Sequence, residues 1–209
     1  QLERQRTLRY LLGWILAAGL AGSAGGVVAQ GFAMGVAWLG SVPGAVGIPR
    51  WTFPVIGAAV NALVVFSLFR SSVDEGTASY IRGVRSRFGI LPASQTIGIG
   101  IAGLVTVGSL GIAGGISPAT RLAAGVCSDL TRRLQRVGIV RRYQIRTAAI
   151  AGFAGAAGAL TGAPIGSGIF AVEVLDRSSM RYRDLFPAII AGAFGTAVSR
   201  ALGGPLLVA

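Results

Sequence analysis

Histidine and lysine are absent from this chain of 209 residues, and Cys127 is its one cysteine. A single cysteine cannot close an internal disulfide, and a chain without histidine cannot build a Cys/His metal cluster or a Ser-His-Asp catalytic triad. We expect Cys127, within an apolar helical pattern, to be a small buried packing residue rather than a reactive thiol. These absences exclude most familiar enzyme sites, so we expect a protein that is not an enzyme and uses neither a metal nor a cofactor.

Charge is also scarce. Charged residues make up 12% of the chain, against roughly 25% in soluble domains, while 53% of the residues are hydrophobic and the mean hydropathy is +0.69. The 19 basic residues, all arginine, outnumber 7 acidic ones. They gather in short groups between long apolar segments and not along one amphipathic face, so a lipid bilayer, and not a nucleic acid, is the expected partner.

Long apolar segments divide the chain. A helix needs about 20 apolar residues to cross a bilayer, so the first, second, third and last segments are long enough, while the sixth looks short. The expected fold is therefore all-α, multi-pass and integral to the membrane. The segments cover residues 9–39, 51–69, 92–113, 116–131, 147–160, 163–175 and 185–203.

The arginine groups indicate an orientation. If the N-terminus is cytoplasmic and each segment reverses direction, every group falls on the cytoplasmic side, as the positive-inside rule requires. The loop at 41–50 would then face outside, with Trp51 at the interface. We expect a prokaryotic plasma membrane protein with a cytoplasmic N-terminus. The groups are Arg4, Arg6 and Arg9; Arg70, Arg82, Arg85 and Arg87; Arg132, Arg133, Arg136, Arg141, Arg142 and Arg146; and Arg177, Arg181 and Arg183.

Glycine is abundant, with 33 residues. Pairs four positions apart, such as Gly22 with Gly26 and Gly31 with Gly35, predict helices that approach one another closely, because membrane helices pack through small residues.

The stretch GIAGGISPATRL, residues 111–122, interrupts an apolar region with three glycines and a proline. Pro118 suits the first turn of a helix, which predicts a new helix that begins at about Ile116 or Ser117 inside the membrane. The free amides and positive dipole end of such a helix favour an anion. An ordinary glycine kink between packed helices remains the alternative.

Two further stretches show the same kind of interruption. FRSSVDEGTASYIRG, residues 69–83, places Ser71 and Ser72 before a helix start, where serine commonly caps the first amides. LTGAPIGSGIFAVEVL, residues 160–175, opens a short apolar helix with Gly-Ala-Pro and carries Glu173 near its end.

In this order and spacing, the three stretches resemble the N-terminal half of the CLC chloride channel and transporter family. The family's Gly-Ser-Gly-Ile-Pro motif is matched by RSSVD at 70–74, and its Gly-Arg-Glu-Gly-Pro motif by GGISP at 114–118. The family's Asn-Ala-Pro-Leu-Ala-Gly stretch, which ends in Glu-Glu, is similar to GAPIGSGIFAVEV at 162–174.

The resemblance implies the first repeat of an inverted-repeat helical membrane fold with broken and re-entrant helices. Residues 1–209 would form the N-terminal half of the core, the second half would be absent from this chain, and the full-length protein would be a homodimer. The transported ion would be chloride or a similar small anion. The implied anion-binding residues are Ser71, Gly115, Ile116, Ser117 and Pro118.

Two departures from the family pattern bear on mechanism. Ile116 stands where the family carries its gating glutamate, and Val174 stands where exchangers carry an internal proton-transferring glutamate, whereas Glu173 matches a neighbouring glutamate found in channels and exchangers alike. The resemblance therefore implies passive, channel-like anion conduction. The alternative is a coupled anion/proton antiporter or another secondary transporter with helices broken near the midplane.

Arg121 lies one turn into the helix that follows the first break. An intramembrane arginine suggests a functional role, here drawing anions towards the site. It could equally pair with a nearby carboxylate or extend to an interface. For Glu173, hydrogen bonding to neighbouring backbone is favoured over titration.

Two other function classes stay open. A membrane enzyme is disfavoured because Asp74, Asp129, Glu173 and Asp176 show no paired spacing that suggests metal or acid/base chemistry. A purely structural membrane module would leave the three helix breaks unexplained.

Overall fold

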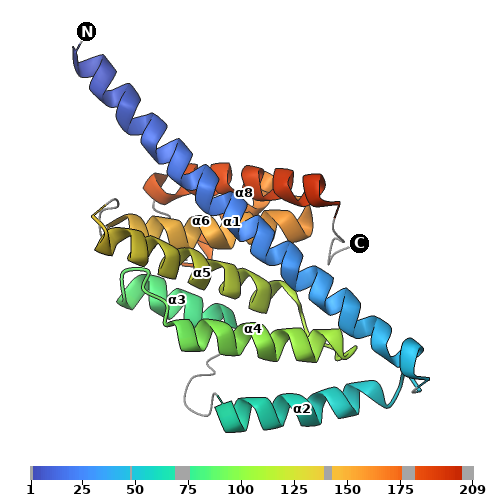
Figure 1. Cartoon of the computed structure of the whole chain (residues 1–209). Helices are drawn as coiled ribbons and strands as arrows, with labels where there is room; N and C mark the ends of the chain where they lie inside the picture. Colours follow the sequence, from blue (N-terminus) through green and yellow to red (C-terminus); the bar gives the residue numbers. More distant parts are fainter. Residues whose placement is uncertain (1, 48, 69–75, 139–142, 176–181, 204–209) are drawn as a thin grey trace.

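The computed structural model describes residues 2–47, 49–68, 76–138, 143–175 and 182–203. Within these ranges every regular element is an α-helix, as predicted from the composition (Figure 1). The helices are α1 (Leu2–Val46), α2 (Phe53–Leu68), α3 (Gly76–Ser86), α4 (Ala93–Gly108), α5 (Ile116–Arg136), α6 (Tyr143–Thr161), α7 (Pro164–Glu173) and α8 (Tyr182–Leu202).

The helices form a bundle that α1 crosses diagonally, with its N-terminal end extending beyond the other helices (Figure 1). Helix α1 packs against α6 and α8, α5 packs against α6, α4 packs against α5, and α2 contacts α4 at the edge of the bundle. Helices α6 and α8 begin at the same end of the bundle, where Arg146 and Asp184 pair, and the short helix α7 lies between them in the chain.

In the part of the chain that the structure describes, two helices contain stretches long and apolar enough to cross a membrane by themselves, at Trp14–Val46 and Arg183–Leu202. The predicted spans at 51–69 and 92–113 are shorter than expected. Helices α2 and α4 have 16 residues each, which corresponds to about 24 Å, below the roughly 30 Å of a hydrocarbon core. Helix α4 ends early because the chain turns after Gly108, where Leu110 adopts a positive φ of 63°.

The predicted loop at 41–50 was partly wrong, because α1 continues to Val46. Pro43 lies inside this last part of the helix. Proline breaks a helix by removing one amide donor and crowding the preceding turn, yet here the helix continues for three residues beyond it.

Described arginines gather at one end of the bundle. The last turns of α3 and α5 and the first turns of α6 and α8 carry most of them, and these helix ends lie on the same side of the molecule (Figure 1). Arg50 and Arg200 lie at the opposite end. This distribution agrees with the alternation expected from the positive-inside rule, and the cytoplasmic placement of the N-terminus stays a prediction.

Glycines bring α1, α6 and α8 into backbone contact. A Cβ on Gly22 or Gly26 would collide with the backbone of Ala191 or Gly195 of α8, so these two positions confirm the predicted close approach. The prediction was wrong for Gly31, where a Cβ would meet nothing within 4 Å.

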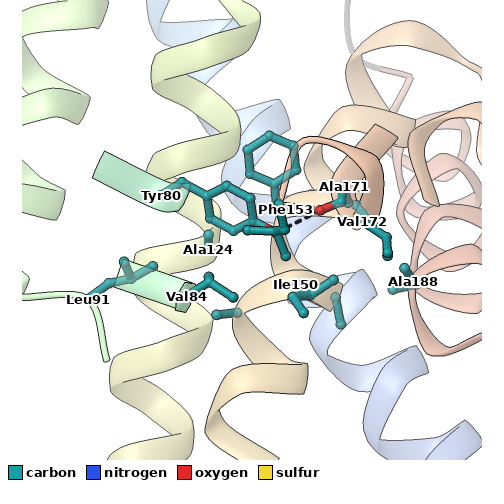
Figure 2. Packing of buried hydrophobic residues seen from close by; sticks show 14 residues of the cluster. Tyr80, Val84, Leu91, Ala124, Ile150, Phe153, Ala171, Val172 and Ala188 are labelled. Atoms are coloured by element: carbon teal, nitrogen blue, oxygen red, sulfur yellow. Dashed lines mark hydrogen bonds between the residues drawn. The ribbon is translucent and has the colours of Figure 1, made fainter. Parts of the chain in front are cut away.

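A buried apolar cluster fixes α3 against α6 and α7 (Figure 2). Tyr80 of α3 is fully buried and stacks on Phe153 of α6, with 4.2 Å between the ring centroids. Its hydroxyl donates a hydrogen bond of 3.1 Å to the carbonyl of Ala171 in α7. This contact holds the first turn of α3, three residues before Tyr80, in a defined place.

Cys127 is buried as predicted, with 2% of its surface exposed. Its thiol donates to the carbonyl of Ala21 at 3.4 Å. The side chain also packs against Gly152, where a Cβ would collide with it. Cys127 is therefore a packing residue between α1, α5 and α6.

Candidate functional site

Helix α5 begins at Ile116, at the position that the glycines and Pro118 predict. Gly115 is the residue before the helix, with φ −72° and ψ −19°, and no side chain in the described part of the chain caps the helix there. The first amides of any α-helix lack partners within the helix. Because these amides lie at a break between two apolar segments, they are available to an anionic ligand.

The first turn of α3 meets the first turn of α5. The hydroxyl groups of Thr77 and Ser117 are hydrogen-bonded at 2.8 Å, and both residues are partly buried. The N-terminal ends of two helices therefore converge at one place. Each end carries roughly half a positive charge from its helix dipole, so the convergence creates a positive potential inside an apolar bundle.

Pro118, the residue after Ser117, brings the start of α5 against α4. Its ring packs against Gly103 of α4, where a Cβ would come within 2.6 Å of the Pro118 Cγ atom and within 3.6 Å of Phe32. Glycine at 103 is thus required for α4 to lie this close to the start of α5. The three helices α3, α4 and α5 together define the junction.

Arg121 lies one turn further along α5 and is fully buried, with 0% of its surface exposed. Its Nε atom donates to Ser79 of α3 at 2.7 Å and its Nη1 atom donates to Thr96 of α4 at 3.0 Å. Its Nη2 atom has no hydrogen-bond partner in the described chain. The side chain therefore does not extend to an interface, and its partners are neutral hydroxyls.

Described carboxylates lie away from this junction. Asp129 is paired with Arg132 and Arg133 at the end of α5. Asp184 is paired with Arg146 between α8 and α6. Arg121 takes part in no ion pair among the described residues, so pairing with a carboxylate, one of the alternatives for this residue, is not found there.

The predicted anion-binding residues are partly brought together. Gly115, Ile116, Ser117 and Pro118 form the start of α5, as adjacent residues must, and α3 joins them there. Ser71 lies outside the described residues, as do Ser72, Asp74 and Asp176. No group of three or more His, Cys, Asp or Glu side chains gathers to hold a metal within the described chain.

Val174 and Glu173 lie at the end of α7, apart from this junction. Val174 is partly buried and packs against the apolar cluster that contains Tyr80. Glu173 is exposed at the last position of α7. Val174, which matches the family's proton-transferring glutamate, therefore packs against the apolar cluster around Tyr80.

Sequence reasoning missed Thr77, Ser79 and Thr96. Thr77 and Ser79 lie in the serine-containing stretch at 69–83, where their spacing of two residues gave no reason to pair them with α5. The Thr96 hydroxyl donates to the carbonyl of Pro92, the residue before α4, and Thr96 belongs to no motif. Only the packing of α3 and α4 against α5 reveals these three residues.

Comparison with known proteins agrees with this arrangement. Residues 59–208 match the family model described as voltage gated chloride channel. The chain belongs to this family, the CLC family. The family resemblance found in the three interrupted stretches is thereby confirmed.

Two relatives illustrate the CLC match. A chloride/fluoride channel protein from Pseudomonas syringae pv. tomato (strain ATCC BAA-871 / DC3000) is 27% identical over 205 residues, which cover 96% of this chain and 43% of that protein. The crystal structure of a CLC-type fluoride/proton antiporter is similar with a TM-score of 0.75 at 21% identity, covering 93% of this chain and 48% of the antiporter chain.

These relatives establish the fold and show how much of a CLC protein this chain covers. The helical arrangement is that of the CLC fold, and membership in this family together with the apolar helices identifies an integral membrane protein. The chain spans less than half the length of both relatives.

Proposed function

We propose that the protein containing this chain transports a small monovalent anion, such as chloride or fluoride, across a membrane. The observation that carries this proposal is the convergence of α3 and α5 at the Thr77–Ser117 contact, with the first amides of α5 uncapped by side chains of the described chain. Free amides and two aligned dipoles favour a negative ion.

The surroundings make this convergence suitable for transport. Lipid cannot satisfy a free amide, so irregular backbone at membrane depth occurs where it lines a protein cavity or a water-filled path. A weakly held anion could exchange its water molecules for amide and hydroxyl donors at this place. Neutral donors bind an anion without trapping it as a metal or several fixed charges would, and conduction needs release as well as binding.

We propose uncoupled conduction. Ile116 follows directly after the uncapped residue Gly115 and carries an aliphatic side chain that can neither ionise nor compete with the anion as a carboxylate. Val174 likewise offers no proton-carrying group. Neither position can couple a proton to the anion.

The coupled alternative is favoured by one observation, the name of the structural neighbour, which is a fluoride/proton antiporter. At 21% identity this neighbour supports the shared fold. A coupled mechanism in this chain would need a carboxylate near the junction, whereas the described Asp129 and Asp184 are paired with arginines elsewhere.

Further proposals follow from the family resemblance. Residues 1–209 would form the N-terminal half of the transporting core, the protein would be a homodimer in a prokaryotic plasma membrane, and its N-terminus would be cytoplasmic. It would act as a transporter and not as an enzyme.

The test uses the full-length protein in liposomes loaded with potassium chloride or potassium fluoride. Anion efflux is recorded with an ion-selective electrode, and external pH is recorded at the same time. With valinomycin to carry the compensating potassium, an uncoupled conductor releases the anion without proton uptake. Proton uptake locked to anion efflux would establish the antiporter, and absence of any anion flux would contradict transport.

A further inference from the structure

We propose that a groove between α1, α5 and α6 holds one acyl chain of an anionic phospholipid, with the lipid phosphate against the last turns of α5. This inference goes beyond the proposed anion transport and does not depend on it. The ligand is identified by its chemistry, an apolar chain that continues into a negatively charged headgroup.

The groove is bordered mostly by small apolar side chains and has a volume of about 520 Å³. Alanines of α1 and α6 line two of its walls. The third wall is a face of α5 on which Cys127, Leu130 and Leu134 recur at helical spacing. Alanine side chains leave space between packed helices that larger apolar side chains would fill. The alanines are Ala17, Ala18, Ala21, Ala24, Ala148 and Ala151.

One end of the groove lies at the arginine end of the bundle, where α5 finishes and α6 begins. The Cys127 thiol donates to Ala21, and Phe32 packs in one cluster with Ala119, so α1 and α5 run in opposite directions. Trp14, which also lines the groove, therefore lies towards the end of α5. Tryptophan is enriched where a membrane helix passes the headgroup level.

The length of the groove matches one leaflet. Along α1 it extends for ten positions, from Trp14 to Ala24, which corresponds to about 15 Å of helix. This is half of the roughly 30 Å thickness of a hydrocarbon core. The groove therefore has the depth of a single acyl chain that enters from the leaflet at the arginine end.

Polar residues of the groove lie towards this same end. Thr131 is in the last turns of α5, and Gln144 and Thr147 are in the first turns of α6. The groove is also open to the surface of the described bundle, since Leu20 and Leu130 of its lining are 73% and 49% exposed. A lipid chain can enter there with its headgroup beside the polar residues.

Positive charge adjoins the polar end of the groove. Arg133 follows Leu130 by three positions and therefore lies beside it on the helix surface. Its Nε atom donates to Asp129 at 2.9 Å, yet 73% of its side-chain surface stays exposed. Arg132 shares the same carboxylate, so two arginines and one aspartate leave this turn positive. Basic pockets between membrane helices recognise anionic lipid headgroups, and this charge selects an anionic lipid over a neutral one.

The experiment measures lipid binding to the full-length protein in detergent by native mass spectrometry. The protein is titrated with phosphatidylglycerol and, separately, with phosphatidylcholine that carries the same acyl chains. Wild type should bind one phosphatidylglycerol per protein chain roughly fivefold more tightly than phosphatidylcholine, as expected for one arginine near an anionic headgroup. Equal affinity for the two lipids would overturn the inference.

A groove-filling variant tests the place of the acyl chain. Ala17→Phe puts a ring into the groove, and its matched control is Ala37→Phe, since both alanines are exposed on α1 and Ala37 does not line the groove. Ala17→Phe should bind phosphatidylglycerol at least about tenfold more weakly, as expected when roughly two methylene groups can no longer be buried. Ala37→Phe should bind it as wild type does.

A charge variant tests the place of the headgroup and serves if Ala17→Phe does not fold. Arg133→Gln should lose the preference for phosphatidylglycerol. The matched control Arg136→Gln should keep it, because Arg136 is exposed at the end of the same helix but is not a three- or four-residue neighbour of Leu130 or Leu134. Equal lipid preferences in these two variants would overturn the inference.

Coverage of the groove by another part of the full-length protein, or by a second copy, gives a different result. Ala17→Phe would then lower the unfolding temperature relative to Ala37→Phe and leave the number of bound lipids unchanged. That outcome would also overturn the inference. None of these results depends on anion flux, so the transport proposal stands or fails separately.

Discussion

Arg146 at the start of α6 and Asp184 at the start of α8 form an ion pair that joins the two helices where they enter the bundle. Both side chains are largely buried, with 20% and 9% of their side-chain surfaces exposed. The backbone of Arg146 also contacts Gly89, in the connection between α3 and α4. Arg146 therefore connects the start of α6 to the start of α8 through its side chain, and to the connection between α3 and α4 through its backbone.

Asp184→Asn should destabilise the full-length protein. Removing one member of a buried pair leaves an uncompensated charge, at a cost of about 3 kcal/mol. We expect a clearly lower unfolding temperature in detergent for Asp184→Asn and a smaller loss for the double variant Arg146→Met with Asp184→Leu. A single variant as stable as wild type would show that the pair is solvated in the full-length protein.

Gly155→Val should prevent the bundle from forming. A Cβ on Gly155 would collide with the backbone of Gly22 in α1, and backbone atoms of packed helices cannot move aside without separating the helices. The control is Gly31→Ala on α1, where a Cβ would meet nothing within 4 Å. That variant should be as stable as wild type or more stable by up to about 1 kcal/mol, because alanine is the better helix former.

Expression and size-exclusion chromatography of the two glycine variants provide the measurement. Gly155→Val should yield little monodisperse protein, and Gly31→Ala a normal amount. Equal behaviour of the two variants would mean that α1 and α6 do not approach as closely as the structure shows.

Thr77→Val and Ser117→Ala should each weaken anion binding, because each removes a hydroxyl from the junction. A single neutral hydrogen bond contributes about 1 kcal/mol, so we expect roughly a fivefold rise in the anion Kd. If the two hydroxyls act through their mutual bond, the double variant should lose little more than either single one. Fully additive losses would show that they contact the anion independently.

The starts of α5 and α7 were predictable because their signals are local. Glycine breaks the preceding helix, and proline suits the first turn of the next, so Ile116 and Pro164 begin helices as expected. The extension of α1 to Val46 was not predictable from Pro43 alone. Whether a helix continues past a proline depends on the structure around it, and a sequence pattern does not reveal this.

The partners of Arg121 also could not be predicted. Ser79 and Thr96 are separated from Arg121 by 42 and 25 positions, and neither belongs to a motif. They meet because α3 and α4 both pack against α5. The start of the helix could be predicted from local residue preferences, whereas the electrostatic surroundings of the site depend on tertiary packing.

The most direct measurement compares Ile116→Glu with Ile116→Gln in anion-efflux assays across pH 4 to 8, a range that spans the ordinary glutamate pKa of about 4.3. Glutamate is mostly protonated at the low end and negative at the high end, where its carboxylate can compete with the anion at the start of α5. The account predicts that flux through Ile116→Glu falls as pH rises, while flux through Ile116→Gln and wild type stays level. Identical pH profiles for the two variants would place the anion path away from Ile116 and contradict the account.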